Sequence, residues 1–449
     1  MTQKKKLVFS WMLILTMVIS VISPTAAVNV KAAETTGSLS DTYAEKLEGV
    51  TKYLKTNTDV TSTYSYGFEW RIMQQARQGK DEQKLYKTYL DSVEAMLKEG
   101  KTELYTNNYA TLTIALTSIG ADPTNIGGKN LLEGLADYSA LQAAADSYVD
   151  PVAFALIALD SKNYDIPKTD AKEAATRDKI VKLLAGKLDA TTGLYHYKSE
   201  YGGVVYEGDS IDSTGAILQA LAPYYSDNKD VKAIVDKSLN TLSKQQRTDG
   251  AFGGDYDDRV CSTAQVVVAL TALGINPEKD SRFVKNGISP VDAILAFYDS
   301  KTGAIAMEGA YNPLLSCEQA GYALAAYDRV VNKKTSLYDM SDVDYKLYTK
   351  LKLSKPSLKK VTSPKKKQIK ATWKKIKTVT GYELQVSTSS KFKNAKTFKV
   401  KKAAKTSTIM KKSIKSGKKY FVRMRTYKTK LDGTVVKSGW SNKKAVTTK

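Results

Sequence analysis

The sequence predicts an all-α domain, an (α/α)6 toroid, followed by an all-β sandwich domain. The toroid is predicted by an apolar, helix-length stretch that recurs along residues 33–345 and alternates with amphipathic stretches. The sandwich is predicted by a change of pattern over residues 356–449, where helical spacing gives way to short alternating strands. Residues 346–355, which are rich in lysine and precede Pro356, form the predicted linker.

The first 32 residues have the pattern of a signal peptide. Lys4–Lys6 form a positive start, Leu7–Ile22 an apolar core, and Val30–Ala32 a small-residue cleavage site, with Ala27 as the alternative. The apolar core is shorter than the roughly 20 residues of a membrane-spanning helix, and no later segment is apolar enough to span. We therefore expect a secreted protein, extracellular or associated with the cell wall, that does not span the membrane.

The clearest copy of the apolar repeat is Ser262–Leu273, which is followed by Gly274 and Pro277. It is apolar on nearly every side, which is typical of a helix buried all round. The other copies are Gly67–Gly79, Asn108–Ile119, Tyr148–Leu159, Ser213–Tyr224 and Ser316–Tyr327. From the second copy onward, successive copies lie 40, 65, 49 and 54 residues apart. Repeats of this length predict an array of helix pairs.

Amphipathic stretches lie between these copies and predict an outer layer of helices. Their apolar stripes are Leu47/Val50/Leu54, Leu85/Tyr89/Val93/Met96, Ile180/Leu184/Leu188, Ile234/Leu239/Leu242 and Val291/Ile294/Leu295. Six inner helices inside six outer ones close into a toroid, and an open superhelix is the alternative. Turns of one form separate some of the pairs, each with a glycine where positive φ is needed, at Gly193, Gly250 and Gly303.

This first domain resembles the terpenoid-cyclase and protein-prenyltransferase superfamily of α/α toroids. The similarity is carried by Gln246–Phe252, which looks like that family's Gln-x-x-x-Gly-x-Trp turn with Phe for Trp, and by Ser262–Pro277 and Gly67–Gly79. The last two stretches read like exported Firmicute surface proteins with prenyltransferase/squalene-cyclase-type repeats. The resemblance implies the fold, whereas the superfamily's activities range from cyclases to carriers.

The cyclase activity of that superfamily depends on an Asp-x-Asp-Asp motif, which Asp255, Asp257 and Asp258 resemble. Clustered carboxylates can retain a proton at neutral pH. The motif here begins about four residues too early relative to the inner helix, which turns it away from a central cavity. We therefore expect a solvated acidic loop, with Asp257 and Asp258 as weak catalytic candidates.

Two further activities of such toroids find no matching residues. Zinc-dependent transfer needs three protein ligands, but the single histidine, His196, has no ligand set around it, so we expect neither a metal nor another cofactor. Ser316–Gln319 is similar to the Cys-Gly-Glu-Gln thioester motif, but Cys317 and Gln319 are only two residues apart and their side chains diverge on a helix.

The remaining choice is between a binding protein and a glycan-processing enzyme. An enzyme would need two carboxylates across a cleft, for which Asp212, Asp258 and Glu318 are available. The loops that enter the inner helices are rich in aromatic and polar side chains, which suits a glycan or small ligand at the mouth of the toroid. The residues that we expect to contact it are Trp70, Tyr195, Tyr197, Tyr206, Asp212, Tyr256, Asp258, Tyr311 and Glu318.

Two cysteines, Cys261 and Cys317, begin consecutive inner helices on the same rim. Export would let a disulfide persist, and neighbouring helix axes roughly 8–10 Å apart make a bridge demanding but feasible. Two free thiols are the alternative.

The second domain is strongly basic and resembles a fibronectin type III domain. Residues 351–449 carry a net charge of +29, while the whole chain carries +23 and residues 1–350 therefore −6. Trp373 takes the core tryptophan position, Ile414–Tyr420 resembles the approach to a tyrosine corner, and Ser438–Asn442 fits the last strand. The partner that we expect is an anionic cell-wall polymer or glycan. A domain this basic could also bind nucleic acid, but a secreted protein would not meet it, so we do not expect nucleic acid as a partner.

Overall fold

The computed structural model describes residues 39–57, 60, 63–80, 82–254, 257–344, 353–376, 379–429 and 435–449. The main division of the chain into two compact units follows Val343. The first unit is helical and the second is built of antiparallel strands, which confirms the predicted order of an all-α and an all-β part. The predicted signal peptide and most of the predicted linker lie outside the described residues.

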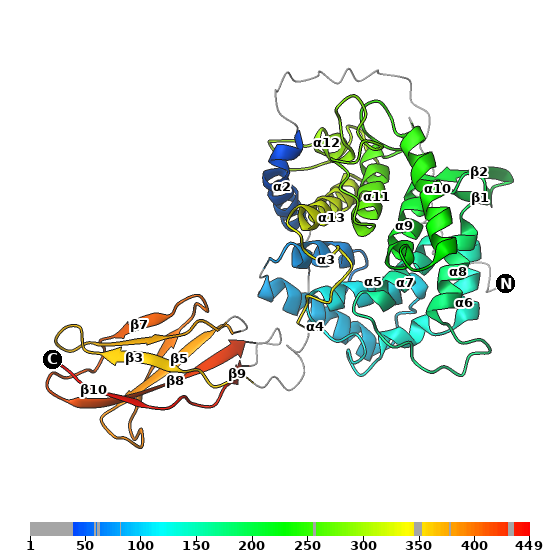
Figure 1. The fold of residues 1–449 in the computed structure, drawn as a ribbon. Helices are drawn as coiled ribbons and strands as arrows, with labels where there is room; N and C mark the ends of the chain where they lie inside the picture. The colour runs from blue at the N-terminus through cyan, green and yellow to red at the C-terminus, as the bar shows by residue number, and fades with distance from the viewer. Residues whose placement is uncertain are drawn as a thin grey trace. The chain divides into compact units, whose positions relative to one another are not determined.

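Six helices of the first unit form a ring in which each helix packs against the next (Figure 1). They are α3 (Glu69–Arg77), α5 (Thr106–Ser118), α7 (Asp150–Asp160), α9 (Ile211–Leu221), α11 (Arg259–Ala272) and α13 (Pro313–Val331). Because α13 packs against α3, the ring is closed, and the open superhelix is not the arrangement that forms. The ring helices fall on the six copies of the apolar repeat.

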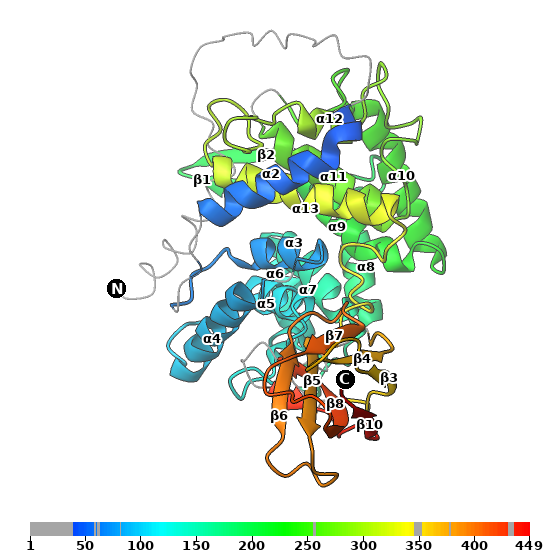
Figure 2. The same ribbon diagram turned by 90° about the vertical axis from the view of Figure 1, so that its left-hand side faces the viewer.

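A second set of helices surrounds this ring (Figure 2). They are α2 (Tyr43–Thr56), α4 (Gln83–Glu99), α6 (Tyr138–Ser147), α8 (Arg177–Lys187), α10 (Lys229–Gln245) and α12 (Pro290–Leu295). Each of the longer ones buries a single stripe, as α2 does with Leu47, Val50 and Leu54. Short 3₁₀ turns lie at Leu39–Thr42, Leu131–Leu135 and Ala222–Tyr224, and a hairpin of β1 (Tyr195–Tyr201) and β2 (Val204–Ser210) leads into α9.

The ring helices are buried on every side, as the apolar repeat predicts. Every residue of α11 from Val260 to Thr271 is buried. Neighbouring helices also approach closely: a Cβ atom on Gly215 would lie 2.8 Å from the Cβ of Gln265, so glycine is required where α9 crosses α11. The turn glycines Gly193, Gly250 and Gly303 have the predicted positive φ, between 74° and 82°.

Buried glutamines connect three ring helices, a feature that the repeat pattern does not predict. The Gln219 amide of α9 donates to the Gln265 side chain of α11 at 2.8 Å, and Gln265 donates to Gln319 of α13 at 2.9 Å. Because an unpaired buried amide is costly, these contacts require a fixed rotation of each helix about its axis.

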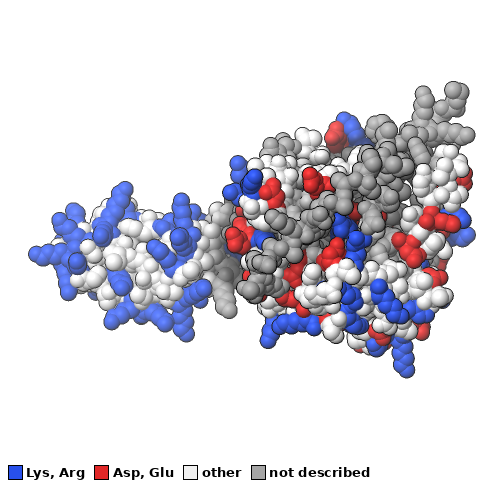
Figure 3. All heavy atoms as spheres, turned by 90° about the horizontal axis from the view of Figure 1, so that it is seen from above, with Lys and Arg blue, Asp and Glu red and all other residues white. Residues whose placement is uncertain are grey.

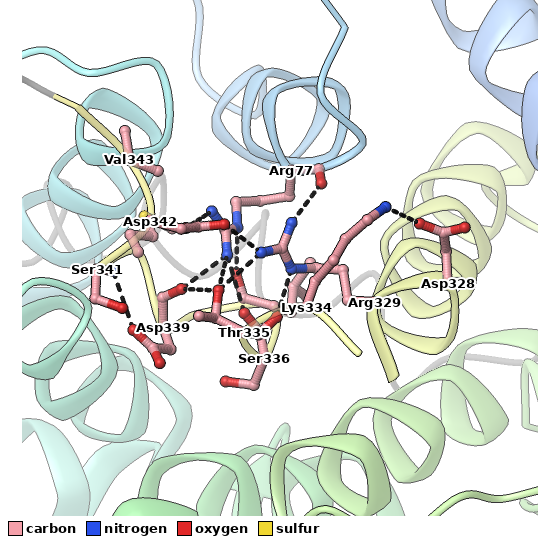
Figure 4. A network of polar contacts seen from close by, with 12 residues as sticks. Arg77, Asp328, Arg329, Lys334, Thr335, Ser336, Asp339, Ser341, Asp342 and Val343 are labelled. Atoms are coloured by element: carbon pink, nitrogen blue, oxygen red, sulfur yellow. Dashed lines mark hydrogen bonds and ion pairs between the residues drawn. The ribbon is translucent and has the colours of Figure 1, made fainter. Parts of the chain in front are cut away.

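Two buried arginines join α3 to the chain that follows α13 (Figure 4). Arg77 of α3 donates to the backbone carbonyls of Leu337, Ser336 and Asp339 and pairs with Asp342 at 2.6 Å. Arg329 pairs with the other Asp342 oxygen at 2.6 Å and donates to the Arg77 carbonyl at 2.8 Å. This cluster connects the first ring helix to the last and so stabilises ring closure.

The second unit contains two antiparallel sheets. One has the strand order β3 (Leu358–Thr362), β4 (Ile369–Trp373), β7 (Ser407–Met410). The other has the order β10 (Lys444–Thr447), β8 (Lys419–Thr429), β5 (Gly381–Ser387), β6 (Lys396–Val400), and β9 (Val435–Lys437) also pairs with β8. The core between the sheets holds Trp373 and Tyr382, whose ring centroids are 5.0 Å apart. The Tyr420 hydroxyl accepts a hydrogen bond from the backbone N–H of Lys415 at 2.9 Å.

None of the helices in the described part of the chain is both long and apolar enough to cross a membrane.

Candidate functional site

The ring helices all begin at the same end of the toroid. This follows from contacts that join the start of one helix to the start of its neighbour, and from a contact between Thr117 and Tyr164 that joins the far ends of α5 and α7 at 2.9 Å. The pairs at the starting end are Tyr66 with Asn107, Asp150 with Ser213, Asp212 with Ser262, Asp258 with Ser316, and Glu318 with Arg71. We call this end the N-terminal rim.

Three carboxylates of the N-terminal rim each lie beside a serine of the next ring helix. The Ser316 hydroxyl of α13 donates to Asp258 Oδ2 of α11 at 2.5 Å. Asp212 of α9 lies next to Ser262 of α11, and Asp150 of α7 lies next to Ser213 of α9. The partial positive charge of helix N-termini favours carboxylates here. We call Asp150, Asp212 and Asp258 the acidic arc, because α7, α9 and α11 are consecutive in the ring.

Asp212 has the electrostatics of a group that can exchange a proton near neutral pH. Burial raises its pKa, the hydrogen bond from Ser262 lowers it, and the charges of Asp150, Asp257 and Asp258 raise it further, to about 7. Burial likewise raises the pKa of Asp150, against hydrogen bonds from Tyr148 and Ser213 that lower it. Carboxylates of this kind cluster at functional sites.

The aspartates of the cyclase-like motif are placed differently from one another. Asp258 caps α11, since its Oδ1 accepts from the N–H groups of Val260 and Cys261 at 3.0 and 3.2 Å. Asp257 is exposed and accepts from the Gly254 N–H at 2.6 Å. Asp255 and Tyr256 lie outside the described residues.

Glu318 is buried and forms an ion pair with Arg71 of α3. Burial raises its pKa to about 7, even though the positive charge of Arg71 lowers it. Glu69, two residues before Arg71 on α3, is also buried and accepts hydrogen bonds from the Tyr64 hydroxyl at 2.8 Å and the Gly67 N–H at 2.9 Å. These two acids are therefore held by protein partners where α13 meets α3.

The opposite half of the N-terminal rim carries exposed tyrosines. Among the tyrosine side chains that the structure describes in the first unit, Tyr66, Tyr105 and Tyr311 are the exposed ones, at 45%, 55% and 78%. Each lies just before a ring helix, α3, α5 and α13 respectively, and these three helices are consecutive in the ring. We call them the aromatic arc. The sequence placed Tyr66 and Tyr311 in the loops at the mouth of the toroid, and the structure adds Tyr105.

The other aromatic candidates are more enclosed. Trp70 is half-buried and packs on Phe154 and Tyr322, with ring centroids 4.8 and 5.8 Å away. Tyr197 and Tyr206 are half-buried on the β1–β2 hairpin. Tyr195 is a correction to the expected site: it is 8% exposed and belongs to the hydrophobic core, because the hairpin starts there by packing onto α9.

Cys261 and Cys317 are both buried free thiols, so the disulfide that the sequence allowed does not form in this structure. The Cys317 sulfur instead accepts a hydrogen bond from the Ile305 N–H at 3.2 Å. His196 is paired with Asp209 at 3.0 Å on the hairpin. Within the described part of the chain no three His, Cys, Asp or Glu side chains are grouped so that they could hold a metal ion.

The second unit presents a basic surface. On the face shown in Figure 3, blue side chains cover this unit, whereas blue and red are mixed over the first. Glu383 is the one acidic side chain among the described residues of 353–449, and it is buried between Arg425 at 2.8 Å and Lys437 at 3.3 Å. Nearly all of this unit's charge is therefore uncompensated.

Sequence reasoning found the acidic candidates but not their partners. Arg71 and Glu69 carry no recognisable motif and become neighbours of Glu318 only when the ring closes. Ser213, Ser262 and Ser316, in contrast, hold equivalent first positions in three copies of the repeat. That repetition in the sequence could have indicated that each of these serines lies beside a carboxylate of the preceding ring helix.

Comparison with known proteins gives little further information. No protein-family model matches the chain, and no curated protein matches it. Among solved structures, the chain is similar to a possible member of the GH105 family from Salmonella enterica serovar Paratyphi A, with 13% identity and a TM-score of 0.42. The match covers 70% of this chain and 100% of that one. Because the TM-score is below 0.5, we draw neither fold nor function from this similarity.

Proposed function

We propose that the toroid binds a carbohydrate at its N-terminal rim. The observation that carries the proposal is the division of the rim into an aromatic arc on α13, α3 and α5 and an acidic arc on α7, α9 and α11. Exposed tyrosine rings can pack against the apolar face of a sugar ring. Carboxylates can accept hydrogen bonds from sugar hydroxyls, and bonds to charged acceptors are the stronger kind.

The second part of the proposal concerns location. The protein is secreted after removal of residues 1–32, and its basic domain holds it on an anionic polymer of a Gram-positive cell wall. The signal-peptide pattern and the net charge of +29 over residues 351–449 support this role. The two antiparallel sheets of three and five strands, buried Trp373 and the Tyr420 contact support a fibronectin type III-like identity for this domain.

A second candidate function is an exported enzyme that uses the same rim. Asp212, with its pKa raised to about 7, is the group that favours it, because a general acid must hold a proton near the working pH. Its partner carboxylate would be Asp150 or Asp258, which fits glycan processing. A cyclase-like reaction through Asp255, Asp257 and Asp258 has less support, since Asp257 is exposed and Asp258 caps a helix.

Carbohydrate binding is tested with the full mature chain against a panel of glycans by thermal shift and calorimetry. We expect Tyr311→Ala to weaken binding of a glycan hit about 3- to 10-fold, while Tyr311→Phe keeps the ring and changes it little. Asp230→Asn, on the exposed side of α10, is the matched charge control for Asp212→Asn. If no glycan raises the unfolding midpoint, or if Tyr311→Ala binds as well as the wild type, the proposal fails.

Asp212→Asn distinguishes the two candidate functions. In a binding protein the substitution weakens the glycan interaction moderately and no product forms with either chain. In an enzyme it abolishes turnover of a substrate that the variant still binds. Wall retention is tested separately by deleting residues 354–449, whose core is distinct from that of the toroid. The deletion should release the protein into the medium.

A further inference from the structure

One face of the second unit holds its positive charges in fixed positions. Every cation–ring contact described for this unit lies on the outer face of the sheet that contains β8 and β5. The contacts are Lys399 with Tyr427, Lys419 and Lys443 with Phe421, Arg423 with Phe392 and Trp440, and Arg425 with Trp440. We call Lys399, Lys419, Arg423, Arg425 and Lys443 the cation–ring face.

The two arginines are the most tightly held members. Arg423 lies between Phe392 and Trp440, with its guanidinium carbon 4.1 and 4.5 Å from the ring centroids. Its Nε and Nη2 also donate to the Gln385 side chain at 2.9 and 2.7 Å. Arg425 lies 4.2 Å from Trp440, and its Nε donates to Glu383 at 2.8 Å. Both guanidinium groups are therefore oriented before any partner arrives.

The chain after β9 places the tryptophan between them. Ser438 forms hydrogen bonds to Thr426 of β8, and Ser441 to Met424, in each case through both its backbone and its side chain. Trp440 lies between these two serines and reaches the outer face, where it contacts both arginines. The motif Ser438–Asn442, which the sequence assigned to the last strand, thus also places the Trp440 ring against the two positively charged groups of Arg423 and Arg425.

These charges are only partly neutralised. Glu383 compensates Arg425, whereas Arg423 has no acidic partner among the described residues, and neither arginine uses Nη1 in a bond to them. Burial and the neighbouring charge of Arg425 both lower the pKa of Arg423. An anion beside Trp440 would relieve the repulsion between these two like charges and use the free Nη1 donors.

The outer face of the other sheet provides a contrast. Lys360 and Lys370 lie on β3 and β4, are exposed, and contact no aromatic ring among the described residues. Such side chains carry charge but lose rotamer freedom when they bind a partner, which weakens the binding. For the same number of positive charges, the cation–ring face should therefore bind an anion more tightly than the outer face of the other sheet.

We propose that the cation–ring face is the surface that binds a polyol-phosphate polymer of the cell wall. This inference rests on the proposed wall-retention role and assigns it to one face and one chemistry. Alternate residues on one side of a strand lie about 6.7 Å apart, so Lys419, Arg423 and Arg425 form a row along β8 that suits a repeating anion rather than a single ion. The Nη1 groups of Arg423 and Arg425, which the hydrogen bonds to Gln385 and Glu383 do not use, can donate to phosphate oxygens.

Two other polyanions fit less well. Single-stranded nucleic acid binds by stacking bases on free aromatic faces, but the rings here are already covered by cations. A polyuronate offers planar carboxylates, and the one planar carboxylate at this face, Glu383, already occupies the fork of Arg425. A phosphate has oxygens in three dimensions and can contact Arg423 and Arg425 together.

The test measures binding of the full mature chain to poly(glycerol phosphate) over a salt series. Arg423→Gln/Arg425→Gln removes two charges from the face, and Lys360→Gln/Lys370→Gln removes two from the other sheet. We expect the first pair to weaken binding at least 10-fold and to reduce the slope of log K against log salt by about 2, and the second to weaken it less than 3-fold. Lys399→Gln/Lys443→Gln, at exposed positions of the same face, serves if the arginine variant does not fold.

Three results would overturn the inference: equal losses from the two lysine pairs on opposite sheets, equal affinity for polygalacturonate, or tighter binding of single-stranded DNA. Wall retention of the same variants separates this inference from the proposed function. If deletion of 354–449 releases the protein but the face variants stay on the wall, only the face assignment is wrong. If the deletion itself releases nothing, wall retention by this domain is wrong.

Discussion

The hydroxyl of Ser316 on α13 donates a 2.5 Å hydrogen bond to Asp258 Oδ2 on α11, while Asp258 Oδ1 caps its own helix. One carboxylate thus fixes the start of one ring helix and the position of the next. Asp212 of α9 and Asp150 of α7 also lie beside a serine of the next ring helix, so a Ser–Asp neighbour pair recurs along the acidic arc.

Ser316→Ala should lower the free energy of unfolding by about 1.5–3 kcal/mol, because it removes a buried bond to a charged group. Urea denaturation at pH 7 measures the change. The matched control is Ser226→Ala, which removes an exposed Ser–Asp bond of 2.8 Å and should cost less than about 0.5 kcal/mol. Equal losses of unfolding free energy from the two substitutions would show that the Ser316–Asp258 bond stabilises the protein no more than an exposed bond does.

Asp212 should make the protein less stable as the pH rises from about 4 to 7. The pKa of Asp212 is about 7 in the folded chain and near 4 in the unfolded chain. Between these pH values the folded state binds more protons than the unfolded state, so the free energy of unfolding falls as the pH rises. The full shift corresponds to about 4 kcal/mol, and solvent screening of a half-buried group reduces it to between about 1 and 4. Asp212→Asn should flatten the profile measured by urea titration, while Asp230→Asn should leave it unchanged.

The arginine cluster that closes the ring should be costly to break. Arg77→Ala leaves the carbonyls of Leu337 and Ser336 and one oxygen of Asp342 without a donor, while the Asp339 carbonyl keeps the Thr335 hydroxyl. We expect a loss of about 3–5 kcal/mol in unfolding free energy. Lys55→Ala removes an exposed pair with Glu82 and should cost less than about 1 kcal/mol. Hydrogen exchange should also accelerate over residues 335–343 in Arg77→Ala. Unchanged exchange there would mean that the segment is held by other contacts.

Both cysteines should be reduced and slow to react in the folded protein. Burial raises the pKa of Cys317 to about 11, and burial, followed by the charge of Asp258, raises that of Cys261. At pH 8 almost no thiolate forms, so a thiol reagent should label two sites within seconds in urea and neither over minutes without it. A mass 2 Da lower in the non-reduced chain would instead demonstrate a disulfide.

The sequence predicted the elements better than their partners. Periodicity located the ring helices because each copy must be apolar on all sides, and the positive φ at Gly193, Gly250 and Gly303 followed from one turn motif. The candidate site was predicted in part: Asp212, Asp258 and Tyr311 lie on the N-terminal rim. Tyr195, by contrast, is in the core, because the sequence does not tell which side of a hairpin strand faces the next helix.

What the sequence alone determined is therefore local: helix positions, turn conformations, the switch to strands after residue 356, and the concentration of charge in the second domain. Only the tertiary structure decided that α13 meets α3, that Arg71 pairs with Glu318 about 250 residues away, and that Trp440 spaces Arg423 and Arg425. The physical reason is that periodic burial depends on near neighbours in the chain, whereas a salt bridge or a stacked cation depends on two side chains brought together by closure of the ring or pairing of the strands.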